Sequence, residues 1–236
     1  MDAKGSIKRV LPKRLHHLYN RLVSRRRIRR RHGIWFELDW KRRATRAGWE
    51  EWRAVYDRSW ENWTEEDLSA DDIRRIASLT ADFETVLDAG CGNGFLLSSL
   101  NGNVRRFVGV DISRTALRLA RERLPRNVTL VQGVLEELPF RNHSFGVVVC
   151  AHTLEHVKDL QRAVAELKRV AAHRLIVLVP VQEYLPYTDD YHLNFFACAA
   201  DLKAAVGAVN ARIERYTIPP GVCAYQGDVL LLAADV

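Results

Sequence analysis

The chain has 236 residues and a mass of 27.1 kDa, enough for one sizeable domain with an appendage. Hydrophobic residues make up 47% of the chain and charged residues 28%, a globular composition that excludes intrinsic disorder. The apolar runs are far shorter than a membrane span, and the four cysteines form no Cys-x-x-Cys pair, which argues against a zinc ribbon or a disulfide scaffold. Because scattered cysteines are typical of a reducing compartment, we expect a cytoplasmic protein.

Charge divides the chain into two parts. Residues 1–46 carry a net charge of +13, whereas residues 47–236 carry −6. Within the first part, an arm of residues 1–32 places leucines at helical spacing among basic side chains, which predicts a basic amphipathic helix. Such an arm suits an anionic partner, either a membrane surface that holds the protein peripherally or a nucleic acid. A solvated charge run without a partner is the alternative.

All six tryptophans lie between residues 35 and 63, within a segment that we define as residues 33–69. Five of its aromatic residues recur every three or four positions: Trp49, Trp52, Tyr56, Trp60 and Trp63. This spacing predicts a helix that packs its aromatic face on the rest of the protein. A second interpretation makes the helix a lid, with Tyr56 or Trp60 over a bound ligand.

Residues 70–236 alternate short apolar runs with helical patterns. The predicted strands are Thr85–Asp88, Phe107–Asp111, Val128–Gln132, Gly146–Cys150, Leu175–Val179, Arg212–Ile218 and Val229–Ala233. The predicted helices are Ala70–Leu79, Phe95–Leu100, Arg114–Leu124, Leu160–Ala171 and Ala199–Val206. Regular alternation predicts an α/β fold with a Rossmann-like, seven-stranded mixed sheet and helices on both faces. No helix separates the last two strands, so we expect them to pair at one edge, with the last strand antiparallel.

A glycine loop follows the first predicted strand, in the pattern Asp88-x-Gly90-x-Gly92-x-Gly94. Neither register of Gly-x-Gly-x-x-Gly finds its third glycine, and the lysine of a P-loop is absent, which argues against dinucleotide and P-loop sites. An acid at the strand end instead suits a ligand with an ammonium group and no phosphate, such as S-adenosylmethionine (SAM). Asp111 ends the second strand, where a carboxylate can accept hydrogen bonds from both ribose hydroxyls.

Four segments of residues 70–236 resemble the class I SAM-dependent methyltransferases, in the same order: Val86–Gly94, Val108–Ser113, Gln132–Phe140 and Phe145–Val157, the last in a Leu-Glu-His-Val form. The resemblance implies SAM as the cofactor. The cofactor-binding residues that it implies, with the lid residue added, are Asp88, Gly90, Cys91, Gly92, Gly94, Asp111, Ile112, Val134, Leu135, Ala151 and Tyr56. Relatives often have an acid where this chain has Val134, so we expect backbone groups around Val134 and Leu135 to recognise adenine.

Histidines follow the fourth predicted strand and precede the last predicted helix. His152, Glu155 and His156 have i, i+3, i+4 spacing, and His192 belongs to a second polar patch, Asp189–Phe196. His152 or His192 could act as the general base for an O–H acceptor. His156 could instead be structural, and a metal held by His152, Glu155 and His156 is the least favoured interpretation. The predicted catalytic residues are therefore His152, His192 and His156, and we assign no metal ligand.

These observations predict methyl transfer from SAM to a small-molecule, glycan or lipid-linked acceptor, at oxygen rather than at nitrogen or carbon. An RNA (tRNA or rRNA) methyltransferase is an alternative, although the acidic charge of residues 47–236 disfavours a nucleic-acid partner. A SAM-fold binding protein without turnover, recruited by its basic arm, is the other alternative. The sequence identifies neither the acceptor nor the oligomeric state.

Overall fold

The computed structural model describes residues 43–61, 66–100, 106–184, 191–208 and 210–236. The basic arm therefore lies outside the described residues, as do Trp35, Trp40 and Trp63. Among the described residues, no helix combines the length and hydrophobicity needed to cross a membrane.

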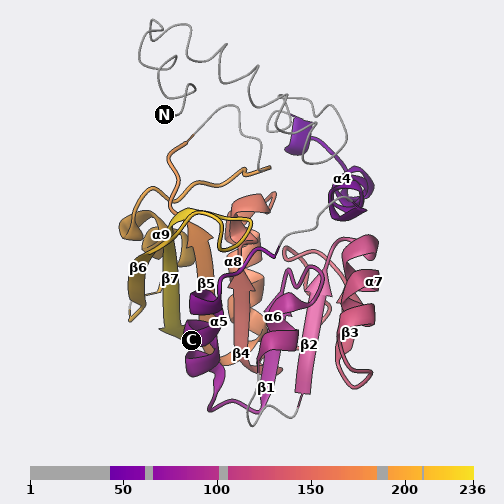
Figure 1. Cartoon of the computed structure of the whole chain (residues 1–236), viewed down its shortest axis with the longest axis horizontal. Helices are drawn as coiled ribbons and strands as arrows, with labels where there is room; N and C mark the ends of the chain where they lie inside the picture. The colour runs from indigo at the N-terminus through magenta and orange to yellow at the C-terminus, as the bar shows by residue number, and fades with distance from the viewer. Residues whose placement is uncertain (1–42, 62–65, 101–105, 185–190, 209) are drawn as a thin grey trace, which may run out of the picture.

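A seven-stranded sheet forms the centre of the fold, in the order β3-β2-β1-β4-β5-β7-β6 (Figure 1). Its strands are β1 Thr85–Ala89, β2 Arg106–Asp111, β3 Thr129–Gln132, β4 Phe145–Ala151, β5 Ala171–Pro180, β6 Arg212–Ile218 and β7 Gly227–Asp235. Neighbouring strands from β3 to β5 pair in parallel, whereas β7 runs antiparallel to both β5 and β6. The predicted mixed sheet with an antiparallel last strand is confirmed.

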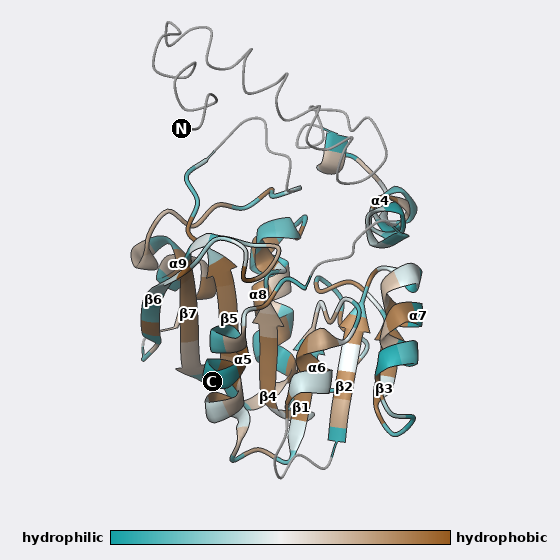
Figure 2. Ribbon diagram, in the orientation of Figure 1, coloured by the Kyte–Doolittle hydropathy of each residue, from teal (hydrophilic) through white to brown (hydrophobic). Residues whose placement is uncertain are grey.

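Helices cover both faces of this sheet. They are α5 Ala70–Thr80, α6 Phe95–Ser99, α7 Arg114–Arg123, α8 Leu160–Val170 and α9 Ala199–Val206. A 3₁₀ turn, η1, spans Leu154–His156, and helix α4, Trp49–Glu61, precedes α5 in the chain. Successive residues of a strand point to opposite faces, so Leu87 packs in the core on the side of α8 and α9, while Val86 packs in the core with Ile76 of α5. Figure 2 shows that the strands of the sheet are mostly hydrophobic.

Helix α8 shows how local sequence sets the spacing of the elements. Asp159 caps its first turn by accepting a hydrogen bond from the Arg162 backbone N–H at 3.1 Å. The helix then enters β5 directly, with Ala171 as both the C-cap and the first strand residue. Without a turn before β5, the strand starts four residues earlier than its apolar run predicts. The added residues include the exposed His173, which interrupts the apolar pattern of the strand.

Helix α4 contacts the domain at two points. Trp52 packs in a small apolar cluster with Tyr191, where its indole N–H donates to the Ala44 carbonyl at 3.0 Å. Asp57 accepts hydrogen bonds from Ser113 Oγ at 2.7 Å and from the Thr115 backbone N–H at 3.0 Å, where α7 begins. Figure 1 places α4 beyond the end of the sheet at which the arrowheads of β1 and β2 lie. The helix is therefore held over the loops that follow those strands.

Candidate functional site

A cavity of about 560 Å³ opens at the C-terminal ends of the parallel strands, where ligands bind in open α/β sheets. One half is lined by the glycine loop after β1 and by the ends of β2 and β3. The other half is lined by residues after β4, by the end of β5 with parts of the β5–α9 connection, and by the turn before β7. The cavity is large enough for a cofactor and a small acceptor group together.

The glycine loop allows two side chains to approach its backbone closely. Gly90 has a φ of +86°, and a Cβ there would collide with the side chain of Thr153. Gly92 has a φ of +51°, and a Cβ there would lie 2.6 Å from Cζ2 of Trp60. The Gly90 and Cys91 backbone N–H groups both donate to the Val110 carbonyl, at 2.8 and 3.0 Å. The loop is thereby fixed between β2, Thr153 and the α4 helix.

Asp111 is held rigidly at the end of β2. Its Oδ2 accepts from the Gly92 backbone N–H at 2.9 Å, and its Oδ1 accepts from the Ser113 backbone N–H at 2.8 Å. Burial raises the pKa of Asp111 to about 6, and these backbone hydrogen bonds limit the rise. The carboxylate is therefore ionised at neutral pH and fixed in the place where the sequence predicts ribose binding.

Asp88 is buried at the end of β1, with 2% of its surface exposed. Its Oδ2 has no hydrogen-bond partner among the described residues. Burial, and then the charge of Asp111, raise the pKa of Asp88 to about 8. An unsatisfied buried carboxylate is costly unless a donor reaches it, and the ammonium group of SAM is such a donor. The residues present therefore fit the methionine end of the cofactor.

Proton release should accompany cofactor binding. With a pKa of about 8, Asp88 is mostly protonated at pH 7, and an ammonium group beside it favours the carboxylate, so about one proton should leave per SAM bound. Calorimetry in buffers of different ionisation enthalpy measures this number. Asp88→Asn should abolish the release. Methylthioadenosine, which lacks the ammonium group, should release none even from the wild type, and equal release with both ligands would contradict the assignment.

Gly94, which is predicted to bind the cofactor, is not among the residues that line the cavity, although its neighbours Asn93 and Phe95 are. It is the N-cap of α6 with a φ of +78°, and a Cβ there would lie 2.6 Å from Cδ1 of Leu124 and 3.2 Å from Cβ of Ala120. The glycine thus permits close packing of α6 on α7. Cys91, by contrast, lines the cavity as predicted for a residue of this loop, and it also packs against Ala120 and Leu124.

Gly94→Ala should therefore act on stability. We expect the free energy of unfolding to fall by about 1–3 kcal/mol, because the alanine is strained at positive φ and collides with α7. Urea unfolding followed by circular dichroism measures the change. Ser98→Ala on the exposed side of α6 is the control and should shift the free energy of unfolding by less than about 1 kcal/mol. An unchanged midpoint in Gly94→Ala would contradict the packing role.

The predicted adenine-side residues gather along one wall. Ile112, Val134 and Leu135 all line the cavity, and Val134 forms an antiparallel bridge with Glu137. Ala151 also lines it, but Thr153 Oγ1 already donates to the Ala151 carbonyl at 2.9 Å. The second lone pair of that carbonyl is what a ligand would use.

The α4 helix packs on the domain, and some of its aromatic residues also line the cavity. Trp52 is buried, and Tyr56 lies between rings, with centroid distances of 6.0 Å to Trp52, 5.9 Å to His156 and 6.2 Å to Tyr191. Burial raises the pKa of the Tyr56 hydroxyl, and this hydroxyl has no hydrogen-bond partner among the described residues. Tyr56 and Trp60 both line the cavity.

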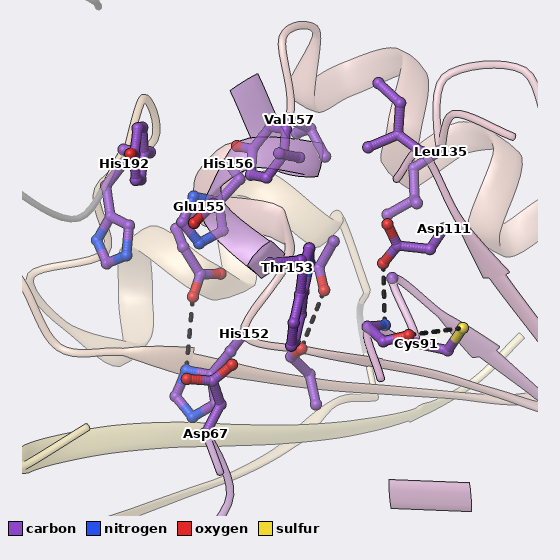
Figure 3. Close-up of a pocket in the computed structure, with 18 of the residues that line it drawn as sticks. Asp67, Cys91, Asp111, Leu135, His152, Thr153, Glu155, His156, Val157 and His192 are labelled. Carbon is purple, nitrogen blue, oxygen red and sulfur yellow. Dashed lines mark hydrogen bonds and ion pairs between the residues drawn. The ribbon is translucent and has the colours of Figure 1, made fainter. Parts of the chain in front are cut away.

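The second half of the cavity contains the three predicted histidines around one carboxylate. Figure 3 shows Glu155 between the ring of His152 and the rings of His156 and His192. His152 Nδ1 lies 3.5 Å from Glu155 Oε1, and the His156 and His192 ring centroids are 4.7 Å apart. Glu155 is buried in the 3₁₀ turn, and its backbone carbonyl accepts from the N–H groups of Leu193 and Asn194 at 2.7 and 3.0 Å. These bonds bring the two histidine segments together.

Charge is balanced within this cluster. Burial alone would raise the pKa of Glu155, but the His152 contact and the charges of His156 and His192 hold it below the ordinary value. Burial likewise opposes protonation of His152, but the contact with Glu155 outweighs it and raises the pKa of the imidazole. The Nε2 atom of His152 is buried with no hydrogen-bond partner among the described residues. That nitrogen is available to a ligand in the cavity.

Several cavity residues escaped the sequence analysis. Thr153, Gln182 and Tyr225 line the cavity, and the Tyr225 ring lies 5.4 Å from that of His152. Thr153 directly follows a predicted histidine and packs on Gly90. The glycine at position 90 was the one sequence feature that indicated a close neighbour there. Gln182 and Tyr225 reach the site through the β5–β7 pairing, which no local pattern reveals.

The fold and the site together define a Rossmann-like methyltransferase domain with a cofactor half and an acceptor half. Residues 87–177 match the family model described as a methyltransferase domain. The uncharacterised methyltransferase YcgJ of Bacillus subtilis is 32% identical over 117 residues, which cover 46% of each chain. Its crystal structure aligns with a TM-score of 0.52 and 18% identity, over 69% of this chain and 97% of that one.

Two further relatives show how varied such proteins are. A demethylmenaquinone methyltransferase of Thermobifida fusca is 35% identical over 109 residues, covering 42% of this chain and 46% of the relative. A mitochondrial arginine hydroxylase of Homo sapiens is 32% identical over 94 residues, covering 39% and 27%. This chain thus spans less than half the length of these curated relatives. Residues 87–177 are therefore similar to a methyltransferase domain, and SAM is the cofactor that this similarity indicates.

Proposed function

We propose that this protein transfers a methyl group from SAM to a hydroxyl oxygen of a small-molecule, glycan or lipid-linked acceptor. The observation that carries the proposal is a single cavity with two chemically distinct halves. One half offers a fixed carboxylate and an unsatisfied carboxylate to a cationic nucleoside. The other half offers imidazole groups to an acceptor that must lose a proton.

On the cofactor side, three features of the described residues support SAM. Asp111 would accept from the ribose hydroxyls, and Asp88 would accept from the ammonium group. The glycine loop has no lysine and presents no built phosphate site. Bound SAM supplies an electrophilic methyl carbon beside a sulfonium. The chain itself then has to orient the acceptor and exclude water, and α4 covers the cavity for that purpose.

On the acceptor side, the histidines favour oxygen over carbon. A hydroxyl loses its proton as it attacks the methyl carbon, so a nearby neutral imidazole accelerates the reaction. His152 is the base that the geometry supports best, because Nδ1 is oriented by Glu155 while Nε2 has no protein partner among the described residues. The Thermobifida fusca relative is named for a quinone acceptor, so a quinol is one of the acceptors that the test must include.

The acceptor class can be tested with methyl-labelled SAM. Phenols and catechols, oligosaccharides, lipid-linked glycans, quinols and tRNA are offered separately, and the labelled product is located by mass spectrometry. We expect label on oxygen of one of the first three classes. Label on tRNA would replace the proposal with an RNA methyltransferase, and label on quinol carbon would replace oxygen with carbon. A folded protein that binds no SAM would overturn the enzyme and favour a binding protein recruited by its arm.

A membrane role for residues 1–32 is a separate part of the proposal. Their 12 arginines and lysines would hold the protein on anionic lipid, which suits a lipid-linked acceptor. Sedimentation with vesicles of phosphatidylcholine containing phosphatidylserine measures this. We expect binding that falls at high salt and is lost when residues 1–32 are removed, whereas retention on neutral vesicles alone would contradict it.

A further inference from the structure

We propose that Glu155, His156 and His192 form a binding site for a divalent first-row transition-metal ion on the acceptor side of the cavity. One ligand atom from each residue can be chosen so that all three lie within 4.8 Å of one another. This set differs from the one considered on sequence grounds, because His192 joins from the β5–α9 connection and His152 contacts the opposite side of the carboxylate (Figure 3). All three residues line the cavity.

Two of the three residues, Glu155 and His156, have buried donor atoms without a hydrogen-bond partner among the described residues. Glu155 has 1% of its surface exposed, and its Oε2 has no hydrogen-bond partner among the described residues. The Nδ1 atom of His156 is likewise buried without such a partner. A buried carboxylate and imidazole that lack partners are costly, and a coordinated metal ion is one way to satisfy both. The unsatisfied atoms therefore point to a ligand that is a cation.

The surroundings of His192 fit a metal ligand. Its Nδ1 lies 2.5 Å from the Gln182 side-chain oxygen, and the tautomer that donates this hydrogen bond has its lone pair on Nε2. A metal-binding histidine usually donates its other N–H to an oxygen in this way, which fixes the ring and its tautomer. Asn194 adds further rigidity by donating to the carbonyls of Leu154 and Val157 at 3.0 and 2.8 Å.

The donor set indicates which ions fit. Two imidazole nitrogens with one carboxylate suit zinc, iron, cobalt, nickel or manganese, whereas magnesium and calcium prefer oxygen donors. Three protein ligands leave coordination positions open, and these face a cavity. The hydroxyl oxygen of the acceptor would occupy one of these open positions.

The metal has a role that rests on the proposed function. An acceptor hydroxyl bound to the ion would be more acidic than in water. Its proton would pass to a base on the acceptor side of the cavity, and the oxygen electron pair would form the new bond to the methyl carbon. The carbon–sulfur bond of SAM would break, with its electrons remaining on sulfur to give S-adenosylhomocysteine. The ion keeps its oxidation state throughout.

Metal binding can be measured on the full chain without SAM or acceptor, so it succeeds or fails independently of the proposed function. The protein is freed of metal with a chelator and titrated with Zn²⁺ by calorimetry and with Co²⁺ by visible absorption. We expect one site, with Zn²⁺ affinity at least 100-fold above that for Mg²⁺. The Co²⁺ spectrum should lack the thiolate charge-transfer band, which separates this site from the cysteines.

Two substitutions and a control locate the site. His192→Ala and Glu155→Gln should each weaken Zn²⁺ binding at least 10-fold, while circular dichroism confirms that both variants are folded. His173→Ala, which removes an exposed histidine far from the cavity, should leave the affinity unchanged. Wild-type binding that is absent, or that survives in His192→Ala, would overturn the site. Because His192 lies on a connection rather than in a regular element, its variant keeps the test valid if Glu155→Gln fails to fold.

Discussion

Asp111→Asn is expected to weaken SAM binding by about 100-fold, which corresponds to ~3 kcal/mol. The asparagine keeps the size of the side chain but loses the charge and one acceptor oxygen. One of the backbone N–H groups of Gly92 and Ser113 would then face the donating NH₂ group, which also loosens the glycine loop. Calorimetry with SAM, S-adenosylhomocysteine and methylthioadenosine measures the loss.

The three ligands separate the two carboxylates of the cofactor half. All three carry the ribose, so Asp111→Asn should weaken them equally. Asp88→Asn should weaken only the two ligands with an ammonium group. Asp159→Asn, which replaces a helix cap outside the cavity with an equally good cap, serves as the matched control and should leave every affinity unchanged. Full affinity in Asp111→Asn would remove the ribose assignment.

The sheet and its order of elements could be predicted because each pattern is local. Strand β6, at Arg212–Ile218, and helix α9, at Ala199–Val206, have the predicted bounds. Strand β5 is longer than predicted because its first four residues include exposed His173 and half-buried Arg174, which interrupt the apolar run. Its hydrogen-bonded partner β7 extends beyond its own apolar run for the same reason, since the backbone pairing continues where hydrophobicity stops.

The cofactor half could also be predicted, because most of its residues follow β1 and β2 in continuous segments. Gly94 is the exception. A glycine at positive φ can serve a ligand or a neighbouring helix, and only the packing on Leu124 distinguishes the two. The acceptor half depends on contacts between distant segments. The i, i+3, i+4 spacing does not place His152, Glu155 and His156 on one helical face, because His152 has a φ of +48° and only Glu155 and His156 belong to the 3₁₀ turn Leu154–His156. The carboxylate therefore separates His152 from His156, and His192 takes the neighbouring position.

His152→Asn should lower the rate of methyl transfer by about 100- to 10,000-fold, the usual contribution of a general base. Asparagine is the substitution of choice because it tolerates the positive φ of this position, yet it cannot take a proton at neutral pH. SAM affinity should stay within about threefold, since the cofactor half does not depend on this side chain. Single-turnover kinetics with methyl-labelled SAM and the acceptor found above measure the rate without the influence of product release.

A second histidine provides the matched control for this experiment. His143 also has a positive φ, of 52°, and its Nδ1 contacts the Ala171 carbonyl at 3.0 Å outside the cavity. His143→Asn makes the same chemical change in the same backbone conformation, so any loss that it causes reports on the fold alone. A His152→Asn rate within tenfold of the His143→Asn rate would exclude His152 as the base. The proton would then have to leave through another group on the acceptor side of the cavity.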